Sequence, residues 1–298
     1  MGRLLEGKVI CITGAGAGIG REYALLAAKE GAKVVVNDLG GTRDGSGSDT
    51  KVADQVVEEI KAAGGEATGH YQDISTAEGG NSLIQTALDK FGKLDALINN
   101  AGILRDGMSF KLTDDQWDLV IKVHLRGHFM CTRAAGAYFR QAGKEDKLPN
   151  GGAIVNTAST SGLLGNAGQA NYGAAKLGIV GMTLCMALEY TKYNVRINAI
   201  APMAYTRMTD DLPIAEMLKE FTPARVAPGV IFLCSDAANG INGQVFGIYG
   251  GKFQLYRLPR PAETWEVEDT WDPTDLAKHA DNIRAKITVV NPPYMPGT

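Results

Sequence analysis

Short runs of consecutive apolar residues alternate with longer amphipathic segments along most of the chain. The runs are rich in β-branched residues and end at turn-forming residues, so we interpret them as strands. They cover residues 8–13, 33–37, 66–72, 94–100, 152–158, 195–201 and 241–251. Strands that are apolar on both faces and separated by helices indicate a parallel sheet with helices on both sides. The pattern predicts one α/β domain with a sheet of about seven strands.

The order of these elements predicts where a ligand binds and where the domain ends. Two successive sets of alternating strands and helices make a doubly wound, Rossmann-like sheet, whose ligands bind beyond the carboxyl ends of the strands. The predicted domain covers residues 1–251. A C-terminal extension over 252–298, with a helical stretch near 275–286, is expected to pack on the domain or on a neighbouring subunit. Residues 203–223 form a loop-rich insertion placed to be a lid.

Composition narrows the expected partners and location. The 298 residues are 45% hydrophobic and 21% charged, and the formal net charge is −3. Without a basic surface, nucleic acid and anionic membranes are not expected partners. No signal sequence and no long apolar span is evident, so a soluble, cytoplasmic protein is expected. The four cysteines and four histidines lack metal-ligand spacing, and we expect reduced thiols and no metal.

The sequence TGAGAGIG (13–20) joins the first strand to a helix and predicts a dinucleotide site. Gly14 permits a tight turn, while Gly18 and Gly20 let a pyrophosphate approach the backbone and let the helix pack on the strand. Asp38 ends the second strand, where a carboxylate accepts the ribose hydroxyls of NAD and repels the additional phosphate of NADP. The alternative for Asp38 is a turn or capping role. NAD is therefore the expected cofactor.

Residues at the ends of two further strands complete the expected pocket. Asp73 is either a partner of the adenine amino group or a cap of the next helix, and both interpretations stay open. The sequence NNAG (99–102) suits close approach of the backbone to a ribose, or ends its strand in a plain turn. The cofactor-binding candidates are Gly14, Gly18, Ile19, Gly20, Asp38, Asp73, Ile74, Asn100, Ala101, Gly102, Tyr172, Lys176 and Thr206.

Three side chains beyond the fifth strand suit oxidation of an alcohol. Tyr172 and Lys176 are four residues apart in a predicted helix and so share a face, and Ser159 ends the preceding strand. Hydride leaves a secondary alcohol only as its hydroxyl proton departs, which requires a base. A tyrosine with a pKa of about 10 is too weak, but a lysine ammonium and an oxidised nicotinamide nearby favour its phenolate. Ser159 then stabilises charge on the substrate oxygen.

Together, TGAGAGIG, NNAG, Ser159 and YGAAK resemble a short-chain dehydrogenase/reductase over about residues 6–250. The resemblance implies these roles for Ser159, Tyr172 and Lys176, and it implies that the lysine also holds the nicotinamide ribose. Members usually have an asparagine on the preceding long helix, where it holds a water of the proton relay. His124 takes that position here and is a catalytic candidate, with a purely structural role as the alternative.

A closer resemblance concerns the substrate. The stretches VVVNDLGG, NNAGILRD, KVHLRGHF, GNAGQANYGAAKLG and IAPMAYTRMT resemble the (3R)-hydroxyacyl-CoA dehydrogenase unit of peroxisomal multifunctional enzyme type 2. The resemblance implies NAD-dependent oxidation of a (3R)-3-hydroxyacyl-CoA to the 3-oxoacyl-CoA, in fatty acid or steroid metabolism. Arg105, Lys111 and Arg126 are either contacts for CoA phosphates or idle surface charges. Apolar lid residues suit an acyl chain or serve plain packing, namely Met203, Tyr205, Met208, Leu212, Ile214, Met217 and Leu218.

Three other functions stay open at this point. The chain also resembles a 3-oxoacyl-ACP reductase, although Asp38 argues against the NADPH that biosynthetic reductases prefer. A dehydrogenase of a hydroxyl on a steroid nucleus is the second alternative, and an NAD-binding scaffold without turnover is the third. The resemblance further implies a homodimer or homotetramer that buries two long helices, at about 115–142 and 171–190.

Overall fold

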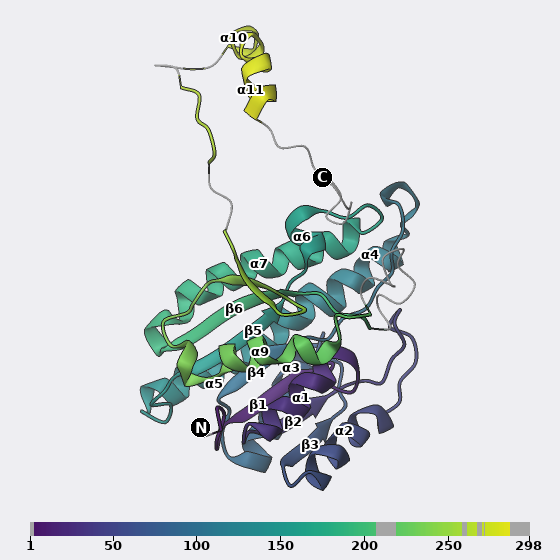
Figure 1. Ribbon diagram of the computed structural model, residues 1–298, viewed down its shortest axis with the longest axis vertical. Helices are drawn as coiled ribbons and strands as arrows, with labels where there is room; N and C mark the ends of the chain where they lie inside the picture. The colour runs from purple at the N-terminus through teal and green to yellow at the C-terminus, as the bar shows by residue number, and fades with distance from the viewer. Residues whose placement is uncertain (1–2, 207–218, 258–260, 267–269, 271, 287–298) are drawn as a thin grey trace.

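One eight-stranded sheet forms the centre of the computed structural model, which describes residues 3–206, 219–257, 261–266, 270 and 272–286 (Figure 1). Its strand order is β3-β2-β1-β4-β5-β6-β7-β8; the first seven strands are parallel and β8 is antiparallel to β7. The strands are β1 (Val9–Thr13), β2 (Lys33–Asn37), β3 (Glu66–His70), β4 (Ala96–Asn99), β5 (Gly152–Thr157), β6 (Val195–Pro202), β7 (Val245–Tyr249) and β8 (Lys252–Tyr256). The doubly wound α/β fold is confirmed.

Helices cover both faces of the sheet, which explains why its strands are apolar throughout. Ile10 and Ile12 of β1 pack into the core beneath α1, α2 and α9, while Val9 and Cys11 pack into the core beneath α3, α5 and α7. Successive side chains of a strand point to opposite faces, so a strand covered twice has no polar side. The helices are α1 (Gly18–Lys29), α2 (Lys51–Ala62), α3 (Ala77–Phe91), α4 (Asp114–Ile121), α5 (Gly127–Lys144), α6 (Thr160–Leu164), α7 (Ala170–Tyr190), α9 (Ala227–Cys234), α10 (Pro273–Lys278) and α11 (Ala280–Lys286).

The long helix expected near 115–142 exists, but a π-helical stretch interrupts it. Lys122–Arg126 is a π-helix that connects α4 to α5 without a break in the chain direction. Such stretches are rare and often occur at functional sites, because the wider turn changes which side chains face inward. His124 within it and His128 in the next turn are both buried.

The eighth strand was not expected from the sequence. Residues 241–251 were interpreted as one last strand that ends at residue 251. Instead β7 ends at Tyr249, and the two glycines that follow connect it directly to β8. Gly250 has a φ of +55°, a conformation that glycine adopts without strain. A two-residue Gly-Gly loop is a typical signal of a β-hairpin. β8 therefore begins at Lys252, where the extension was expected to start.

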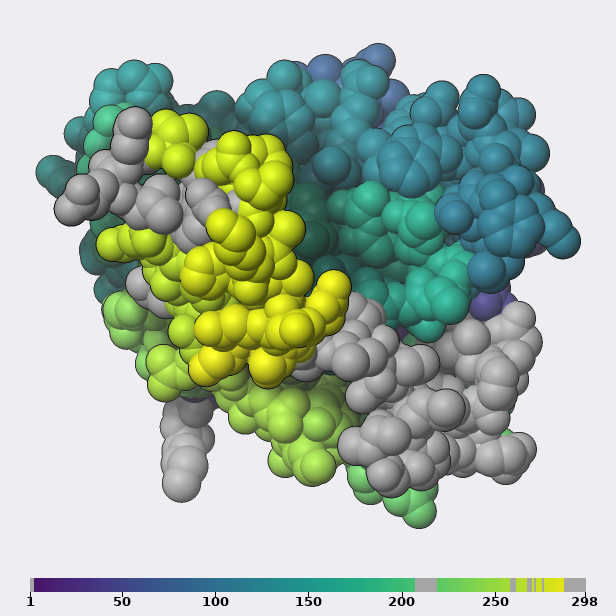
Figure 2. Space-filling model, turned by 90° about the horizontal axis from the view of Figure 1, so that it is seen from above, coloured from purple at the N-terminus to yellow at the C-terminus, as the bar shows by residue number. Residues whose placement is uncertain are grey.

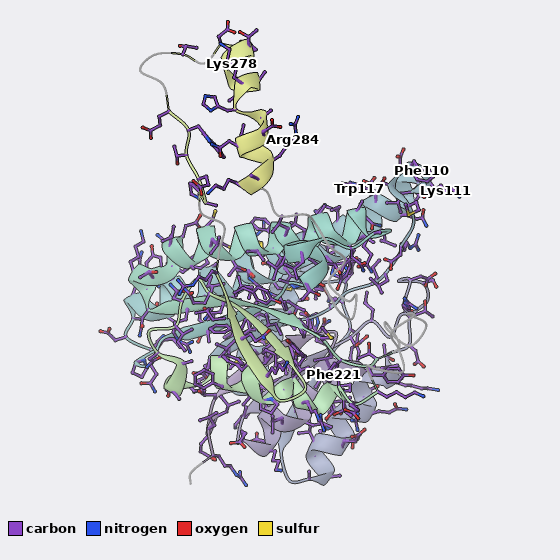
Figure 3. The ribbon with its side chains drawn as sticks, turned by 45° about the horizontal axis from the view of Figure 1, so that its top comes forward. Phe110, Lys111, Trp117, Phe221, Lys278 and Arg284 are labelled. Atoms are coloured by element: carbon purple, nitrogen blue, oxygen red, sulfur yellow. The ribbon has the colours of Figure 1, made fainter. Side chains whose placement is uncertain are left out.

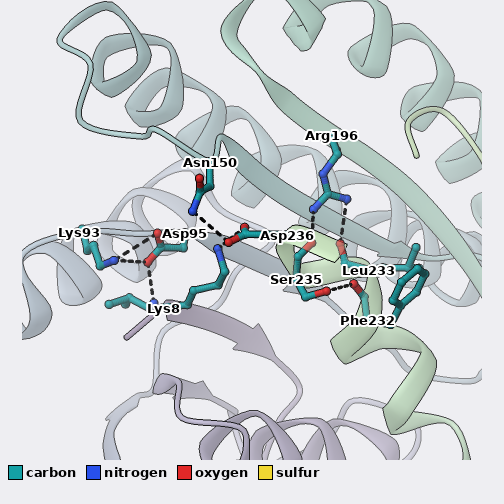
Figure 4. A network of polar contacts seen from close by, with 10 residues as sticks. Lys8, Lys93, Asp95, Asn150, Arg196, Phe232, Leu233, Ser235 and Asp236 are labelled. Atoms are coloured by element: carbon teal, nitrogen blue, oxygen red, sulfur yellow. Dashed lines mark hydrogen bonds and ion pairs between the residues drawn. The ribbon is translucent and has the colours of Figure 1, made fainter. Parts of the chain in front are cut away.

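A network of polar contacts closes the amino-terminal end of the sheet (Figure 4). Lys8 forms a 2.6 Å ion pair with Asp236, which also accepts a hydrogen bond from Asn150 at 2.9 Å. The guanidinium of Arg196 donates to the carbonyl groups of Leu233 (3.0 Å) and Ser235 (2.9 Å). These contacts fasten the end of α9 to strands β1 and β6.

The last two helices stand apart from the rest of the protein. Figure 1 shows α10 and α11 (yellow) projecting beyond the layer of α6 and α7, and Figure 2 shows this arm covering only part of the face seen from above. Lys286 at the end of α11 forms a 3.0 Å ion pair with Glu263, so the arm folds back on itself. No residue of α11 is buried.

Candidate active site

A pocket lies beyond the carboxyl ends of β1, β2 and β4, where the sequence predicts the cofactor. Its lining residues are Gly14, Ala17, Gly18, Ile19, Asn37, Asp38, Leu39, Gly41, Thr42, Gly45, Gly47, Asp73, Ile74, Asn100, Ala101, Gly102, Ile103, Val123 and Thr206. Except for Gly20, Tyr172 and Lys176, every predicted cofactor-binding residue borders this pocket. The structure thus gathers side chains that are up to about 190 positions apart in the sequence.

The glycines of the turn after β1 have different tasks. A Cβ on Gly20 would lie 2.1 Å from the carbonyl oxygen of Gly14, and one on Gly14 would lie 2.7 Å from Cα of Ala101. Both positions therefore permit close packing between the turn, α1 and the end of β4. Gly18 differs, since its φ is +55° and the nearest atom to an added Cβ is in Thr206, 3.8 Å away. Gly18 is the glycine that leaves open space for a ligand.

Asp38 both borders the pocket and shapes it. Its Oδ2 accepts a hydrogen bond from the backbone N–H of Gly16 at 2.8 Å, and its Oδ1 accepts one from Gly40 at 2.7 Å. The carboxylate is thereby oriented before any ligand arrives. Each carboxylate oxygen has a second lone pair available, so these bonds leave room for ribose hydroxyls.

Asn100 and Asp73 make contacts that the sequence did not specify. The side-chain amide of Asn100 donates to the carbonyl groups of Thr13 (3.1 Å) and Gly14 (3.0 Å), and so holds the glycine turn rather than projecting into the pocket. The helix after β3 is capped by Thr76 and not by Asp73. Asp73 instead accepts a hydrogen bond from Ser75 N–H at 2.9 Å and stays at the pocket wall.

Part of the predicted lid lies outside the described residues. Within the described part, Met203 N–H donates to the carbonyl of Ile248 (3.0 Å) and Tyr205 N–H donates to that of Phe221 (2.7 Å). The first bond fastens the segment to β7, and the second joins its two sides to each other, next to Thr206 at the pocket wall. The remaining lid candidates, Met208, Leu212, Ile214, Met217 and Leu218, fall in the range that is not described.

Tyr172 and Lys176 lie in the first two turns of α7, and Lys176 is almost completely buried. The ammonium nitrogen of Lys176 donates to the carbonyl of Thr157 at 2.7 Å and lies 5.4 Å from the centre of the Tyr172 ring. Burial disfavours the charged form and lowers the pKa of Lys176 to about 7. Ser159 begins α6 at the end of the neighbouring strand β5, where its hydroxyl accepts a hydrogen bond from Ser161 N–H (3.1 Å).

His124 is in direct contact with Tyr172. The two rings meet edge to face, with 5.1 Å between their centres. Nε2 of His124 lies 3.1 Å from the backbone nitrogen of Ile103 and 2.8 Å from its oxygen, while Nδ1 has no hydrogen-bond partner among the described residues. Burial holds the pKa of His124 well below its usual value, so the imidazole is neutral. Gly102 makes room for it, because a Cβ there would lie 2.3 Å from the ring.

The amino end of α7 is held by a clamp that was not identified from the sequence. The buried Asn171 donates from its side chain to the carbonyl groups of Arg105 (3.0 Å) and Gln116 (3.1 Å), and its Oδ1 accepts the N–H of Tyr172 (2.8 Å). Two residues before Asn171, Gln169 donates to Asp106 at 2.7 Å. The only sequence signal for this clamp was a pair of amide residues just before Tyr172.

This combination of turn, pocket and tyrosine–lysine pair agrees with comparisons to known proteins. The family model described as short chain dehydrogenase matches residues 8–216. The chain belongs to the short-chain dehydrogenase family. A putative short-chain type dehydrogenase/reductase of Mycobacterium tuberculosis is 46% identical, over 92% of this chain and 96% of its own length. The hydroxyacyl-CoA dehydrogenase ChsB1 of the same organism is 43% identical, over 91% and 87%.

The resemblance to multifunctional enzymes is confirmed as well. The full-length peroxisomal multifunctional enzyme type 2 of Drosophila melanogaster has a structure that superposes with a TM-score of 0.74 and 35% identity. The match covers 93% of this chain but only 45% of that protein. Membership of this family and its hydroxyacyl-CoA dehydrogenase relatives make this chain an oxidoreductase that acts on CH–OH groups.

Short-chain dehydrogenases generally use NAD or NADP, and the residues at the pocket fit such a group. The open space above Gly18, at the beginning of α1, suits a pyrophosphate, since the N–H groups and the dipole of a helix end favour negative charge. Asp38 faces the same pocket with an oriented carboxylate.

In the part of the chain that the structure describes, no helix is long and apolar enough to cross a membrane.

Proposed function

We propose that this enzyme uses NAD to oxidise the secondary alcohol of a (3R)-3-hydroxyacyl-CoA to the 3-oxoacyl-CoA, with Tyr172 as the base. The observation that carries the proposal is the Tyr172–Lys176 pair in contact with His124, at the same end of the sheet as the dinucleotide pocket. The bound dinucleotide supplies the acceptor for the hydride. The protein then has to remove the hydroxyl proton and hold the alcohol oxygen.

Tyr172 in its phenolate form takes the hydroxyl proton of the substrate. A positive charge about 5 Å from the ring stabilises the phenolate by roughly 3 kcal/mol at an effective dielectric constant of about 20. The interaction lowers the pKa of the tyrosine from its usual value of about 10, toward neutral pH. Burial lowers the pKa of Lys176 to about 7, so its positive charge, and with it this stabilisation of the phenolate, is fully present only below that pH.

Ser159 and His124 have supporting roles in this proposal. The hydroxyl of Ser159, at the end of β5, donates a hydrogen bond to the substrate oxygen and stabilises its negative charge. His124 supports the ring of Tyr172 from the side and ties it to Ile103 at the pocket wall. Since its imidazole is neutral, His124 adds no second positive charge beside Lys176, which would disfavour the charged form of the lysine.

The choice of NAD rests on Asp38. Its two oxygens are fixed by Gly16 and Gly40, so the carboxylate cannot turn away from a ribose phosphate at low cost. A negative group held in place favours ribose hydroxyls and disfavours NADP. Arg43 follows in the same loop, but the loop takes its backbone across the pocket to Leu104, whose N–H donates to the Arg43 carbonyl at 3.0 Å.

A coenzyme A thioester is the favoured substrate because of the relatives named above and of an apolar surface beside the catalytic helix. Phe110 and Trp117 are 76% and 42% exposed, and Figure 3 shows them with Lys111 at the end of the helical layer. The clamp at Asn171 links this segment to Tyr172. Apolar side chains next to cations suit an acyl chain with its phosphorylated carrier.

A panel of substrates tests the proposal directly. Initial rates are measured with (3R)- and (3S)-3-hydroxyacyl-CoAs of several lengths, sterol-side-chain thioesters, a free hydroxysteroid and an acyl-carrier-protein thioester, each with NAD and with NADP. We expect the (3R)-CoA thioesters with NAD to react fastest. Preference for NADP with the carrier-protein substrate would favour the reductase alternative, and turnover of the free steroid alone would favour a hydroxysteroid dehydrogenase. No turnover at all would leave only an NAD-binding scaffold.

We also propose that the enzyme works as a homodimer or homotetramer. The outer face of α7 exposes apolar and small residues, among them Leu177 (50% exposed) and Leu188 (82% exposed), and has few charges. The extension with α10 and α11 is proposed to pack on a neighbouring subunit, since it stands apart from its own. Sedimentation of the wild-type chain and of Leu188→Lys tests this, with dissociation expected for the variant.

The cytoplasmic location stays a prediction, because several relatives are named peroxisomal.

A further inference from the structure

The polar loop after β2 crosses the cofactor pocket from one strand to another. We call residues 39–49 the strap. The N–H of Asp49 donates to the carbonyl of Leu39 at 3.0 Å, which joins the two ends of the strap beside β2. Five strap residues line the pocket, namely Leu39, Gly41, Thr42, Gly45 and Gly47. The strap is therefore a wall of the binding site and not only a connection between β2 and α2.

The tip of the strap is fastened at the far side of the pocket. The N–H of Leu104 donates to the carbonyl of Arg43 at 3.0 Å, and Nε of Arg105 donates to the carbonyl of Asp44 at 2.9 Å. Leu104 and Arg105 follow β4, whereas the strap begins at β2, and β1 lies between these two strands in the sheet. The strap thus passes over the end of β1, where the glycine turn begins.

The strap keeps its own shape. The hydroxyl of Thr42 bonds to the carboxylate of Asp44, to the carbonyl of Ser46 (3.0 Å) and to the hydroxyl of Ser46 (2.7 Å). The N–H of Thr42 also donates to the Ser46 carbonyl at 2.8 Å. This internal bonding holds residues 42–46 as one unit, and the contacts with Leu104 and Arg105 fasten that unit at its tip.

Arg105 connects the strap to the catalytic tyrosine. Its side chain holds the strap, while its backbone carbonyl accepts the hydrogen bond from Asn171 that positions the start of α7. The next residue of α7 is Tyr172, whose N–H is bonded to the same Asn171 side chain. A closed strap and an oriented tyrosine therefore depend on one short segment after β4.

From this arrangement we propose that the strap is a clasp over the bound dinucleotide, and that Arg105 is the positioning residue that keeps it closed. The clasp has to open at Leu104 and Arg105 each time the dinucleotide leaves. The strap and its contacts with Leu104 and Arg105 then set the residence time of the cofactor, and they do so without taking part in proton transfer. This inference rests on the proposed function only in assigning the pocket to a nicotinamide dinucleotide.

The rate at which bound NADH leaves tests the clasp. Stopped-flow fluorescence measures dissociation of NADH from the wild type, Arg105→Ala and Arg105→Lys, without substrate. We expect Arg105→Ala to release NADH about threefold to tenfold faster, as the loss of one hydrogen bond predicts. Arg105→Lys keeps a donor and should recover most of the effect. The KM for NAD should rise in Arg105→Ala and return toward the wild-type value in Arg105→Lys.

A matched control separates the clasp from a general effect of losing an arginine. Arg140 on α5 also donates a hydrogen bond through Nε, to the hydroxyl of Tyr193 at 3.2 Å, and neither residue lines the pocket. Arg140→Ala should release NADH at the wild-type rate. Equal rates for wild type and Arg105→Ala, or a lower kcat with unchanged release, would overturn the clasp.

A second variant acts on the tip without touching a charge. Gly45 has a φ of +85°, and a Cβ there would lie 3.2 Å from the side chain of Ile103, whereas Gly47 has a φ of +73° with no atom within 4 Å of an added Cβ. Gly45→Ala should therefore speed release more than Gly47→Ala, which carries the backbone strain alone. Equal release from the two variants would contradict the clasp. A wild-type chain that binds neither NADH nor NADPH would refute the proposed function together with it.

Discussion

The two ends of the central sheet differ in how their charged side chains are paired. At the amino-terminal end, Lys8, Asp236 and Arg196 each have a partner that matches their charge or hydrogen-bonding capacity. At the carboxyl-terminal end, the buried Lys176 has only a neutral carbonyl and an aromatic ring, and none of the described carboxylates forms an ion pair with it. The contacts at the amino-terminal end stabilise the fold. The carboxyl-terminal end instead holds a buried cation without an ion-pair partner, which costs stability and serves the proposed chemistry.

Buried polar atoms follow the same division. Five such atoms have no hydrogen bond among the described residues, and three of them lie at the catalytic end: Asn99 Oδ1, His124 Nδ1 and Thr157 Oγ1. None of the five belongs to the network at the amino-terminal end. An unpaired buried polar atom costs roughly 1–3 kcal/mol, so these three atoms lower stability at the catalytic end.

The largest effect is expected for the residue that carries the proton. Tyr172→Phe removes the base and should lower kcat/KM by about 10²–10⁴-fold, the usual contribution of general acid–base catalysis. Its affinity for NADH and its melting temperature should change little, because the ring and its contact with His124 remain. Steady-state rates, NADH titration and thermal melting check this. Undiminished hydride transfer in this variant would end the proposed mechanism.

Lys176→Met should separate activity from stability most clearly. The variant loses the charge beside Tyr172, so kcat should fall by roughly 10²–10³-fold. It also removes a buried ammonium but leaves the Thr157 carbonyl without this donor, so the protein should become more stable at neutral pH by the difference, on the order of 1–3 kcal/mol. Thermal melting of both proteins, followed across pH, measures the second effect.

The pH dependence of that gain has a definite sign. The pKa of Lys176 is lowered from 10.5 to about 7 in the folded protein. Between these values the unfolded chain binds a proton that the folded chain does not, so the wild type gains stability as the pH rises. The advantage of Lys176→Met should be largest below pH 7 and should shrink toward pH 10. A variant that is less stable than wild type at pH 6 would mean that Lys176 is structurally favourable after all.

At the opposite end of the sheet the reverse result is expected. Arg196→Met leaves the carbonyl groups of Leu233 and Ser235 without their donors, at a cost of roughly 1–3 kcal/mol for each buried group. The melting temperature should drop clearly, while kcat at a temperature where the variant is folded should stay at the wild-type value. A fall in kcat without a change in melting temperature would erase the distinction between the two ends.

The smallest effect is expected for Asp236→Asn. The amide keeps a hydrogen-bond acceptor for Asn150 and gives up only the charge that faces Lys8. Because the Asp236 side chain is 44% exposed, water screens the ion pair, and the loss should be below about 1 kcal/mol. Chemical denaturation of the two proteins side by side measures it. A larger loss would show that the network acts as a unit.

What the sequence predicted well are features encoded within a few neighbouring residues. Seven strands followed from short apolar runs, because burial on both faces leaves a direct mark on each strand. The tyrosine–lysine pair and the glycine turn are equally local. The eighth strand was missed although its signal was local too, since Gly250 and Gly251 were interpreted as the end of a strand and not as a hairpin loop.

What the sequence could not predict are contacts between distant segments. Arg105 is 61 residues from Asp44, and its side chain was interpreted as a candidate for CoA or as an idle charge, whereas its Nε holds the strap. Asn171 is 66 residues from Arg105, and its clamp exists only because β4 and β5 are neighbours in the sheet. The capping of the helix after β3 by Thr76 rather than Asp73 was a local choice between two good caps.

The π-helix from Lys122 to Arg126 makes the length of this segment more important than its composition. A helix turns by about 100° per residue, so the one additional residue of a π turn rotates everything after it by that angle relative to a regular helix. The inward direction of His128, and the face that α5 packs against the sheet, thus depend on the number of residues in this stretch. Loss of a single residue in this segment would rotate the whole of α5 relative to the sheet.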